Sequence, residues 1–192
     1  LADWLRERDD IVLFGHVSPD GDTTGSTLGL WFALQAMGKR AVVCLPGGMP
    51  LLYTWLPGAD QILDPETDAL PFEPETALAV DVSEYDRLGE AGVKRFDSCP
   101  FRGVLDHHKT NDGFGQLFVL DGDAAAVGEL AVELIAALGV MLAGKRQQRM
   151  REELLQYGTR VTGIVIEVWV NHSVRVNGRS PLLARVQCTF PT

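Results

Sequence analysis

The architecture of this chain follows from the segment Ile11-Val-Leu-Phe-Gly-His-Val-Ser-Pro-Asp-Gly-Asp22. Its first part, Ile11 to Gly15, is a compact apolar run that predicts a buried strand. The polar loop that follows leads into Thr24 to Met37, where apolar side chains recur at helical spacing and Gly38 provides a stop. Strand, polar loop and helix in this order begin a βαβ unit, so the segment predicts a parallel sheet.

The rest of the first 140 residues repeats this alternation. Further strands are expected at Ala41 to Leu45, Thr76 to Val82 and Gly103 to Leu105, and further helices over about 84–91 and at Ala124 to Leu138. We therefore predict an α/β fold in which a parallel sheet is flanked by helices.

Charge and composition change near residue 140. Residues 1–140 carry 9 basic and 23 acidic side chains, whereas residues 141–192 carry 8 basic and 3 acidic ones, and none of the 15 aspartates lies after Asp123. We predict a domain over 1–140 and a basic tail over 141–192 that is aberrant or partly disordered. Within this tail, Lys145 to Tyr157 is a candidate charged helix and Gly163 to Val170 a candidate strand.

Composition excludes several classes of protein. A hydrophobic fraction of 46% fits a folded chain, and no apolar run approaches the roughly 18 residues that a membrane span requires. The net charge of −9 argues against a groove that tracks long nucleic acid. Three cysteines without a CxxC pair fit a reducing compartment, so we expect a cytoplasmic protein.

Three polar clusters stand at the carboxyl ends of three predicted strands, where open α/β sheets bind their ligands. They are His16-Val-Ser-Pro-Asp20-Gly-Asp22, then Asp81, then Asp106-His107-His108. Four carboxylates with three imidazoles form a ligand set for Mn²⁺, or for Mg²⁺ and Fe²⁺, and their number suits two ions that catalyse a phosphoryl displacement. Each cluster alone is also typical of a solvated turn, and Asp81 of a helix or turn cap.

These clusters read His16-x-x-Pro-Asp20-Gly-Asp22-x-x-Gly25-Ser26, Asp81-x-Ser83 and Asp106-His107-His108-x-x-Asn111, with Arg87-Leu-Gly and Gly128-Glu129-Leu between and after them. Together they resemble the first three motifs of the DHH phosphoesterase family. Within that family, the Pro-Asp-Gly-Asp segment is most similar to the small bacterial nanoRNases, also called oligoribonuclease/pAp phosphatases. The resemblance covers about residues 3–140.

The resemblance implies a set of metal ligands. His16, Asp20 and Asp81 would hold a first ion. Asp22, Asp81 and His107 would hold a second ion, so that Asp81 bridges the two. Two Mn²⁺ ions are the expected cofactor, with Mg²⁺ or Fe²⁺ as alternatives.

The resemblance also implies two catalytic and two substrate-binding residues. His108 would contact the substrate phosphate, and Asp106 would orient the neighbouring imidazole, as carboxylates often do beside metal-bound histidines. Asn111 and Arg87 are the expected substrate-binding residues.

The function implied is that of a two-metal-dependent phosphodiesterase or phosphatase. Its substrates would be short oligoribonucleotides or 3′-phosphoadenosine 5′-phosphate, and a homodimer is one assembly to consider. Two alternatives stay open: a manganese pyrophosphatase or cyclic-dinucleotide phosphodiesterase on the same centre, or a truncated metal-binding domain without activity.

The chain departs from the family pattern after residue 140. The family's fourth motif supplies a further aspartate, and a second domain holds a Gly-rich segment; neither is found in this sequence. Either the tail is unrelated to the family, or Thr162-Gly-Ile-Val-Ile-Glu167 is a divergent form of the segment and Glu167 replaces the aspartate.

Overall fold

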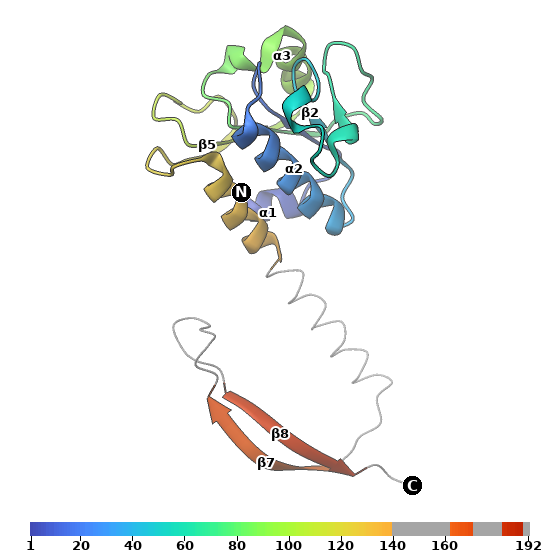
Figure 1. Cartoon of the computed structure of the whole chain (residues 1–192), viewed down its shortest axis with the longest axis vertical. Coiled ribbons are helices and arrows are strands. Elements are labelled where there is room, and N and C mark those ends of the chain that lie inside the picture. Colours follow the sequence, from blue (N-terminus) through green and yellow to red (C-terminus); the bar gives the residue numbers. More distant parts are fainter. Residues whose placement is uncertain (140–161, 171–181, 190–192) are drawn as a thin grey trace. The chain divides into compact units, whose positions relative to one another are not determined.

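The computed structural model of the chain describes residues 1–139, 162–170 and 182–189 (Figure 1). Two units are distinguished by their internal contacts, Leu1–Gly144 and Lys145–Thr192. No helix among the described residues is long and apolar enough to cross a membrane.

The first unit contains the parallel sheet that the sequence predicts. Its six strands are all parallel and follow the order β3-β2-β1-β4-β5-β6. Their bounds are β1 Ile11–Phe14, β2 Ala41–Cys44, β3 Ile62–Leu63, β4 Thr76–Val80, β5 Phe101–Asp106 and β6 Leu117–Leu120. The predicted α/β class is therefore confirmed, and the two outermost strands, β3 and β6, are additions to the four that were predicted.

Helices and 3₁₀ turns connect these strands. The helices are α1 Ala2–Arg6, α2 Gly21–Ala36, α3 Gly89–Ser98 and a further helix that includes residues 127–139, and the 3₁₀ turns are η1 Leu51–Tyr53, η2 Ala59–Gln61 and η3 Tyr85–Leu88. Helix α2 starts earlier than predicted because the carboxylate of Asp20 caps it. The helix expected over 84–91 is instead η3 followed by the longer α3.

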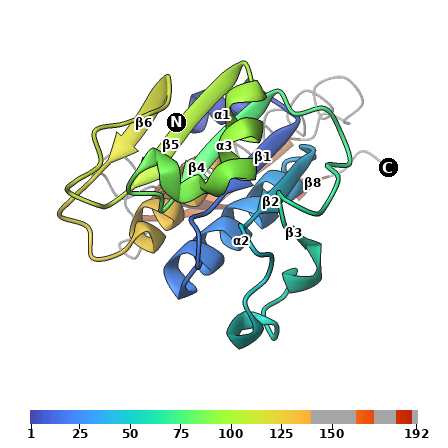
Figure 2. The same cartoon turned by 90° about the horizontal axis from the view of Figure 1, so that it is seen from above.

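Alternation along the central strand divides the core between the two faces of the sheet. Ile11 and Leu13 belong to the cluster that α1, α2 and the 127–139 helix cover, whereas Val12 and Phe14 belong to the cluster that contains Phe96 of α3. Figures 1 and 2 show α3 on one side of the sheet, opposite α1 and α2. Because both faces are covered, β1 and β4 are buried along their whole length.

The order of the strands locates the ligand-binding edge. The chain passes from β1 to β2 on one side and returns to β4 on the other side of β1, so the direction of winding reverses between β1 and β4. Open α/β sheets bind ligands beyond the carboxyl ends of the strands at such a switch point. Here the residues at that point are the loop 15–20 after β1 and Asp81 after β4.

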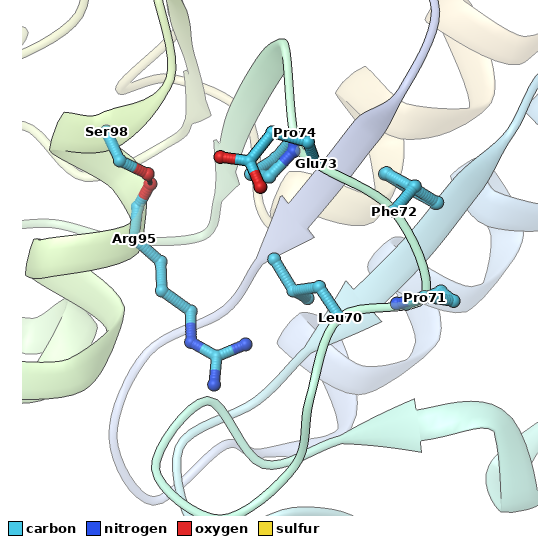
Figure 3. A pocket seen from close by; sticks show the side chains of 7 residues that line it. All are labelled: Leu70, Pro71, Phe72, Glu73, Pro74, Arg95 and Ser98. Carbon is cyan, nitrogen blue, oxygen red and sulfur yellow. Dashed lines mark hydrogen bonds between the residues drawn. The ribbon is translucent and has the colours of Figure 1, made fainter.

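A cavity of about 490 Å³ lies at the other end of the strands (Figure 3). The segment that precedes β4 and the end of α3 form its walls, with Phe72, Glu73 and Arg95 among the lining residues. None of the predicted site residues lines it. This cavity is therefore separate from the candidate metal centre.

In the second unit, β7 (Thr162–Val170) and β8 (Leu182–Thr189) form an antiparallel pair with an irregularity between Val165 and Glu167. The strand expected at Gly163 to Val170 is thus present. The helix expected at 145–157 and the side chain of Glu167 lie outside what the structure describes.

Candidate metal centre

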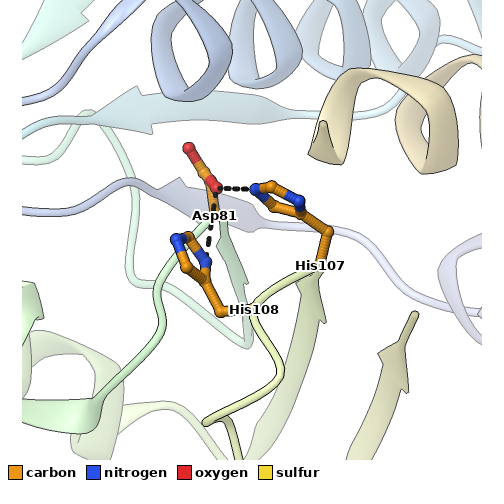
Figure 4. Close-up of side chains that lie close together, drawn as sticks. All are labelled: Asp81, His107 and His108. Carbon is orange, nitrogen blue, oxygen red and sulfur yellow. Dashed lines mark ion pairs between the residues drawn. The ribbon is translucent and has the colours of Figure 1, made fainter. Parts of the chain in front are cut away.

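Asp81 is the centre of the cluster that the fold brings together (Figure 4). It follows β4 directly, with φ at +62°, a left-handed conformation that Asp tolerates better than most residues. Only 2% of the residue is exposed, and Oδ2 accepts a hydrogen bond from Thr23 Oγ1 at 2.6 Å. Oδ1 is buried and has no hydrogen-bond donor among the described residues. Such an oxygen is costly unless something else satisfies it.

Two histidines present a ring nitrogen to this carboxylate. His16 Nδ1 lies 2.8 Å from the Val17 carbonyl oxygen, and His107 Nδ1 lies 3.2 Å from the Ala124 carbonyl oxygen. A carbonyl only accepts, so the Nδ1 of His107 carries the proton and its Nε2 keeps its lone pair. His16 Nε2 is 3.7 Å from Asp81 Oδ2, and His107 Nε2 is 3.6 Å from Asp81 Oδ1. His107 therefore has the tautomer that ligates metals, oriented by the backbone.

Electrostatics oppose the charged form of Asp81. Burial raises the pKa of this carboxyl above its ordinary value, the hydrogen bond from Thr23 lowers it, and the neighbouring negative charge of Asp22 raises it further. A divalent cation at Oδ1 would take the place of the missing hydrogen-bond donor and would offset the repulsion between Asp81 and Asp22. The residues present therefore fit a metal ion.

Asp20 is held ionised at the rim of the same site. Its Oδ1 accepts hydrogen bonds from the backbone N–H groups of Asp22 and Thr23, at 3.0 and 3.1 Å, as the N-cap of α2. Burial raises the pKa of Asp20, but these hydrogen bonds and the nearby His16 outweigh burial and hold that pKa below its usual value. Because the helix uses Oδ1, Oδ2 remains for a cation.

Asp22 meets a second helix. Its Oδ2 accepts from the Val127 N–H at 2.8 Å and its Oδ1 from the Gly128 N–H at 2.9 Å, so the carboxylate caps the helix at 127–139. A Cβ on Gly128 would lie 3.2 Å from Asp22 Oδ1, which explains a glycine there. Oδ2 is also 3.8 Å from His107 Nε2, so Asp22 adjoins the Asp81 cluster.

Asp106 holds His108. The fully buried Asp106 accepts from His108 Nδ1 through Oδ1 at 2.8 Å and from Asn111 Nδ2 through Oδ2 at 2.7 Å. With its proton on Nδ1, His108 keeps a lone pair only on Nε2. More than a third of the His108 side chain is exposed, so a ligand can reach it.

The two predicted substrate-binding residues contact other residues of the site. Asn111 is buried, and its amide also donates to the Val82 carbonyl and accepts from the Gly113 N–H. Arg87 Nη2 lies 3.1 Å from His16 Nδ1 and 3.4 Å from the Val17 carbonyl oxygen. In these positions Asn111 fixes Asp106, and Arg87 braces the loop that carries His16.

Sequence reasoning missed the donors that organise the carboxylates. Thr23 is absent from the residues predicted above, although it contacts both Asp20 and Asp81. Its position three residues after the N-cap is a signal for the first contact but not for the second.

Five of the predicted site residues form two groups that share Asp81, whereas the predicted ligand Asp22, whose two oxygens accept from the N–H groups of Val127 and Gly128, belongs to neither group. The ligand atoms of His16, Asp20 and Asp81 lie within 4.8 Å of one another, and so do those of Asp81, His107 and His108. The His108 nitrogen that lies near Asp81 is Nδ1, at 3.8 Å from Oδ1, and because this nitrogen donates its proton to Asp106 it has no lone pair for a cation. Carboxylate and imidazole donors without thiolates suit Mn²⁺, Fe²⁺ or Mg²⁺.

The chain matches a known protein family and several curated relatives. A family model described as DHH family, N-terminal domain, matches residues 10–159. The bifunctional oligoribonuclease and PAP phosphatase NrnA of Thermus thermophilus is 39% identical over 131 residues, which are 68% of this chain and 37% of that protein. The protein of the same name from Bacillus subtilis is 29% identical over 126 residues, or 66% of this chain and 38% of that protein.

A solved structure shares the fold. An exopolyphosphatase-related protein from Bacteroides fragilis superposes with a TM-score of 0.65 at 30% identity, over 71% of this chain and 42% of that one. The match thus spans well under half the length of each of these relatives.

Proposed function

Because the chain belongs to the DHH family and contains its N-terminal domain, we propose that it is a metal-dependent phosphoesterase that hydrolyses short oligoribonucleotides or 3′-phosphoadenosine 5′-phosphate. The printed names of the curated relatives, oligoribonuclease and PAP phosphatase, support this choice of substrates.

The observation that carries the proposal is the buried, unpartnered Oδ1 of Asp81, with His107 Nε2 at 3.6 Å and with His16 Nε2 at 3.7 Å from the other oxygen. A carboxylate in this position would be shared by the two ions of a two-metal centre. We assign His16, Asp20 and Asp81 to one ion, and Asp22, Asp81 and His107 to a second, with Mn²⁺ as the proposed metal. When bound, such ions lower the pKa of a water molecule and offset the charge of a phosphate.

The chain's own residues then orient the reacting groups. Asp106 fixes the proton of His108 on Nδ1, which leaves Nε2 as the nitrogen that faces a ligand. Once protonated at Nε2, His108 can donate to a phosphate oxygen, and the Asp106 carboxylate stabilises that charged imidazole. Asn111 keeps Asp106 in place, so its contribution to substrate binding is indirect.

The test is Mn²⁺-dependent hydrolysis of the dinucleotide pApA by the purified chain and by Asp81→Asn. Asp60→Asn is the matched control, because Asp60 is an exposed aspartate on η2, outside the cluster. We expect turnover by the wild type and by the control, and none by Asp81→Asn.

Other outcomes separate the alternatives. Hydrolysis of inorganic pyrophosphate without hydrolysis of pApA would replace the proposal with a pyrophosphatase. Mn²⁺ binding without turnover of either compound would identify a metal-binding domain that needs further chain for activity.

A further inference from the structure

The connection between β2 and β3 exposes a patch of large apolar side chains. Leu51 is 90% exposed, Leu52 is 72% exposed and Trp55 is 75% exposed, all within η1 and the residues that follow it. Folded proteins rarely leave three such neighbouring side chains in water unless the surface binds something. We call residues 50–58 the β2–β3 loop.

The β2–β3 loop is braced internally. The Tyr53 N–H donates to the Pro50 carbonyl at 3.0 Å, and the Leu56 N–H donates to the Tyr53 carbonyl at 2.9 Å. The indole N–H of Trp55 donates to the Leu52 carbonyl at 3.0 Å. The single polar atom of the Trp55 side chain is therefore satisfied by the loop itself, and the exposed ring is free to stack.

The β2–β3 loop packs against α2 at two points, its last residue and its middle. Gly58, with φ at +81°, packs so closely that a Cβ there would lie 3.1 Å from Trp31 and 3.2 Å from Phe32. In the middle of the loop, Tyr53 lies so close to the start of α2 that a Cβ added to Gly21 would be 3.4 Å from the Tyr53 hydroxyl and 3.6 Å from its ring. Gly21 stands between Asp20 and Asp22, so Tyr53 lies directly against the segment that carries two of the proposed metal ligands.

We propose that the β2–β3 loop is the nucleobase subsite of this centre, with Trp55 as the stacking platform. The occupant is the base of a nucleotide whose phosphate lies at the metal centre. This inference rests on the proposed function, because it assigns the part of the substrate that the metal centre leaves unexplained. Carboxylates and imidazoles with bound cations recognise a phosphate, whereas a base requires a planar, apolar surface.

The fixed geometry of the β2–β3 loop favours this occupant. A braced ring loses little conformational freedom when a base stacks on it. Stacking also tolerates every base, which suits an enzyme that acts on short oligonucleotides of mixed sequence.

The test compares the binding of AMP and of ribose 5-phosphate, measured by calorimetry in Mn²⁺. The two compounds share the phosphate and the sugar, so the ratio of their dissociation constants isolates the base. The variants are Trp55→Leu, which removes the aromatic plane, and Trp55→Phe, which keeps one. Phe118→Leu is the matched control, since Phe118 is a half-exposed aromatic side chain on the edge strand β6.

We expect Trp55→Leu to weaken AMP binding by about tenfold while leaving ribose 5-phosphate unchanged. Trp55→Phe should retain most of the affinity, and Phe118→Leu should retain all of it. An equal effect on both compounds, no effect on AMP, or no difference between AMP and ribose 5-phosphate in the wild type would overturn the subsite.

Failure of this inference can be told from failure of the proposed function. Base-dependent binding without hydrolysis of pApA would keep the subsite and reject the hydrolysis of oligoribonucleotides by this chain. Hydrolysis of pApA together with binding that does not depend on the base would keep the proposed activity and reject the subsite. A Trp55→Leu chain that binds AMP normally but changes from dimer to monomer in size-exclusion chromatography would show that the patch contacts a second copy, and the subsite would be rejected.

Discussion

Asp81→Asn should raise the free energy of unfolding of the metal-free chain and abolish its response to Mn²⁺. The amide keeps an oxygen to accept from Thr23 Oγ1, and its NH₂ group replaces the unpartnered Oδ1 beside His107 Nε2. Asn also tolerates the left-handed backbone at this position, where φ is +62°. The substitution therefore removes a buried, repelled charge without disturbing the turn.

The size of the gain follows from the missing hydrogen bond. A buried acceptor without a donor costs about 1–3 kcal/mol. Proteins of this length change Tm by roughly 2–4 °C per kcal/mol, so Tm should rise by roughly 2–12 °C. Saturating Mn²⁺ should in turn stabilise the wild type by about 2.7 kcal/mol at 100 times Kd, and should not stabilise Asp81→Asn.

The gain should depend on pH. Burial raises the pKa of Asp81 in the folded chain above its ordinary value of 3.8. A raised carboxyl pKa means that the folded state binds the proton more tightly, so the metal-free wild type loses stability as the pH rises from 3.8 through the folded pKa. The advantage of Asp81→Asn should be smallest below this range and largest above it.

Thermal unfolding in EDTA and then in Mn²⁺, at several pH values, measures the stability gain of Asp81→Asn, its pH dependence and the stabilisation by Mn²⁺. Asp60→Asn is the control and should change stability by less than about 0.5 kcal/mol. A metal-free Asp81→Asn chain less stable than the wild type would refute the view that Asp81 is an uncompensated charge. A Mn²⁺-induced shift retained by the variant would refute its role as the shared ligand.

Two further changes test the supporting contacts. Thr23→Val removes the hydroxyl that donates to Asp81 at 2.6 Å and should lower the free energy of unfolding by about 1–3 kcal/mol in urea denaturation without metal. An unchanged midpoint would show that this hydrogen bond contributes nothing. Gly128→Ala places a methyl group 3.2 Å from Asp22 Oδ1 and should weaken Mn²⁺ binding in calorimetry. Gly25→Ala is the control for this variant, because the added methyl group would lie in open space inside α2 and should stabilise the chain by about 0.5–1 kcal/mol. Equal Mn²⁺ affinities of Gly128→Ala and Gly25→Ala would mean that the contact between Gly128 and Asp22 does not matter for metal binding.

Local patterns were sufficient to predict the centre of the fold. β1 and β4 are buried on both faces, so their sequences are continuous apolar runs that need no knowledge of their neighbours. The polar residues that follow them can be placed at one edge because parallel strands end together. In this way the clusters at His16, Asp81 and Asp106 could be assigned to a common edge from the chain alone.

The sheet edges could not be predicted in this way. β3 has two residues and β6 has four, none of them fully buried in β6, so neither carries a periodic pattern. Both exist because a neighbouring strand supplies hydrogen bonds, and that pairing is a property of the folded sheet.

Tertiary structure alone decided how the candidate ligands are held. Thr23 meets Asp81 across 58 positions of sequence, and Asp22 meets the N–H groups of Val127 and Gly128 across more than 100. That carboxylates and imidazoles gather at the switch point can be inferred from the sequence, because strand ends and turns are encoded locally. Which oxygen of each carboxylate is already occupied, and which is left for a cation, depends on donors brought from distant segments, and only the packed fold brings those donors there.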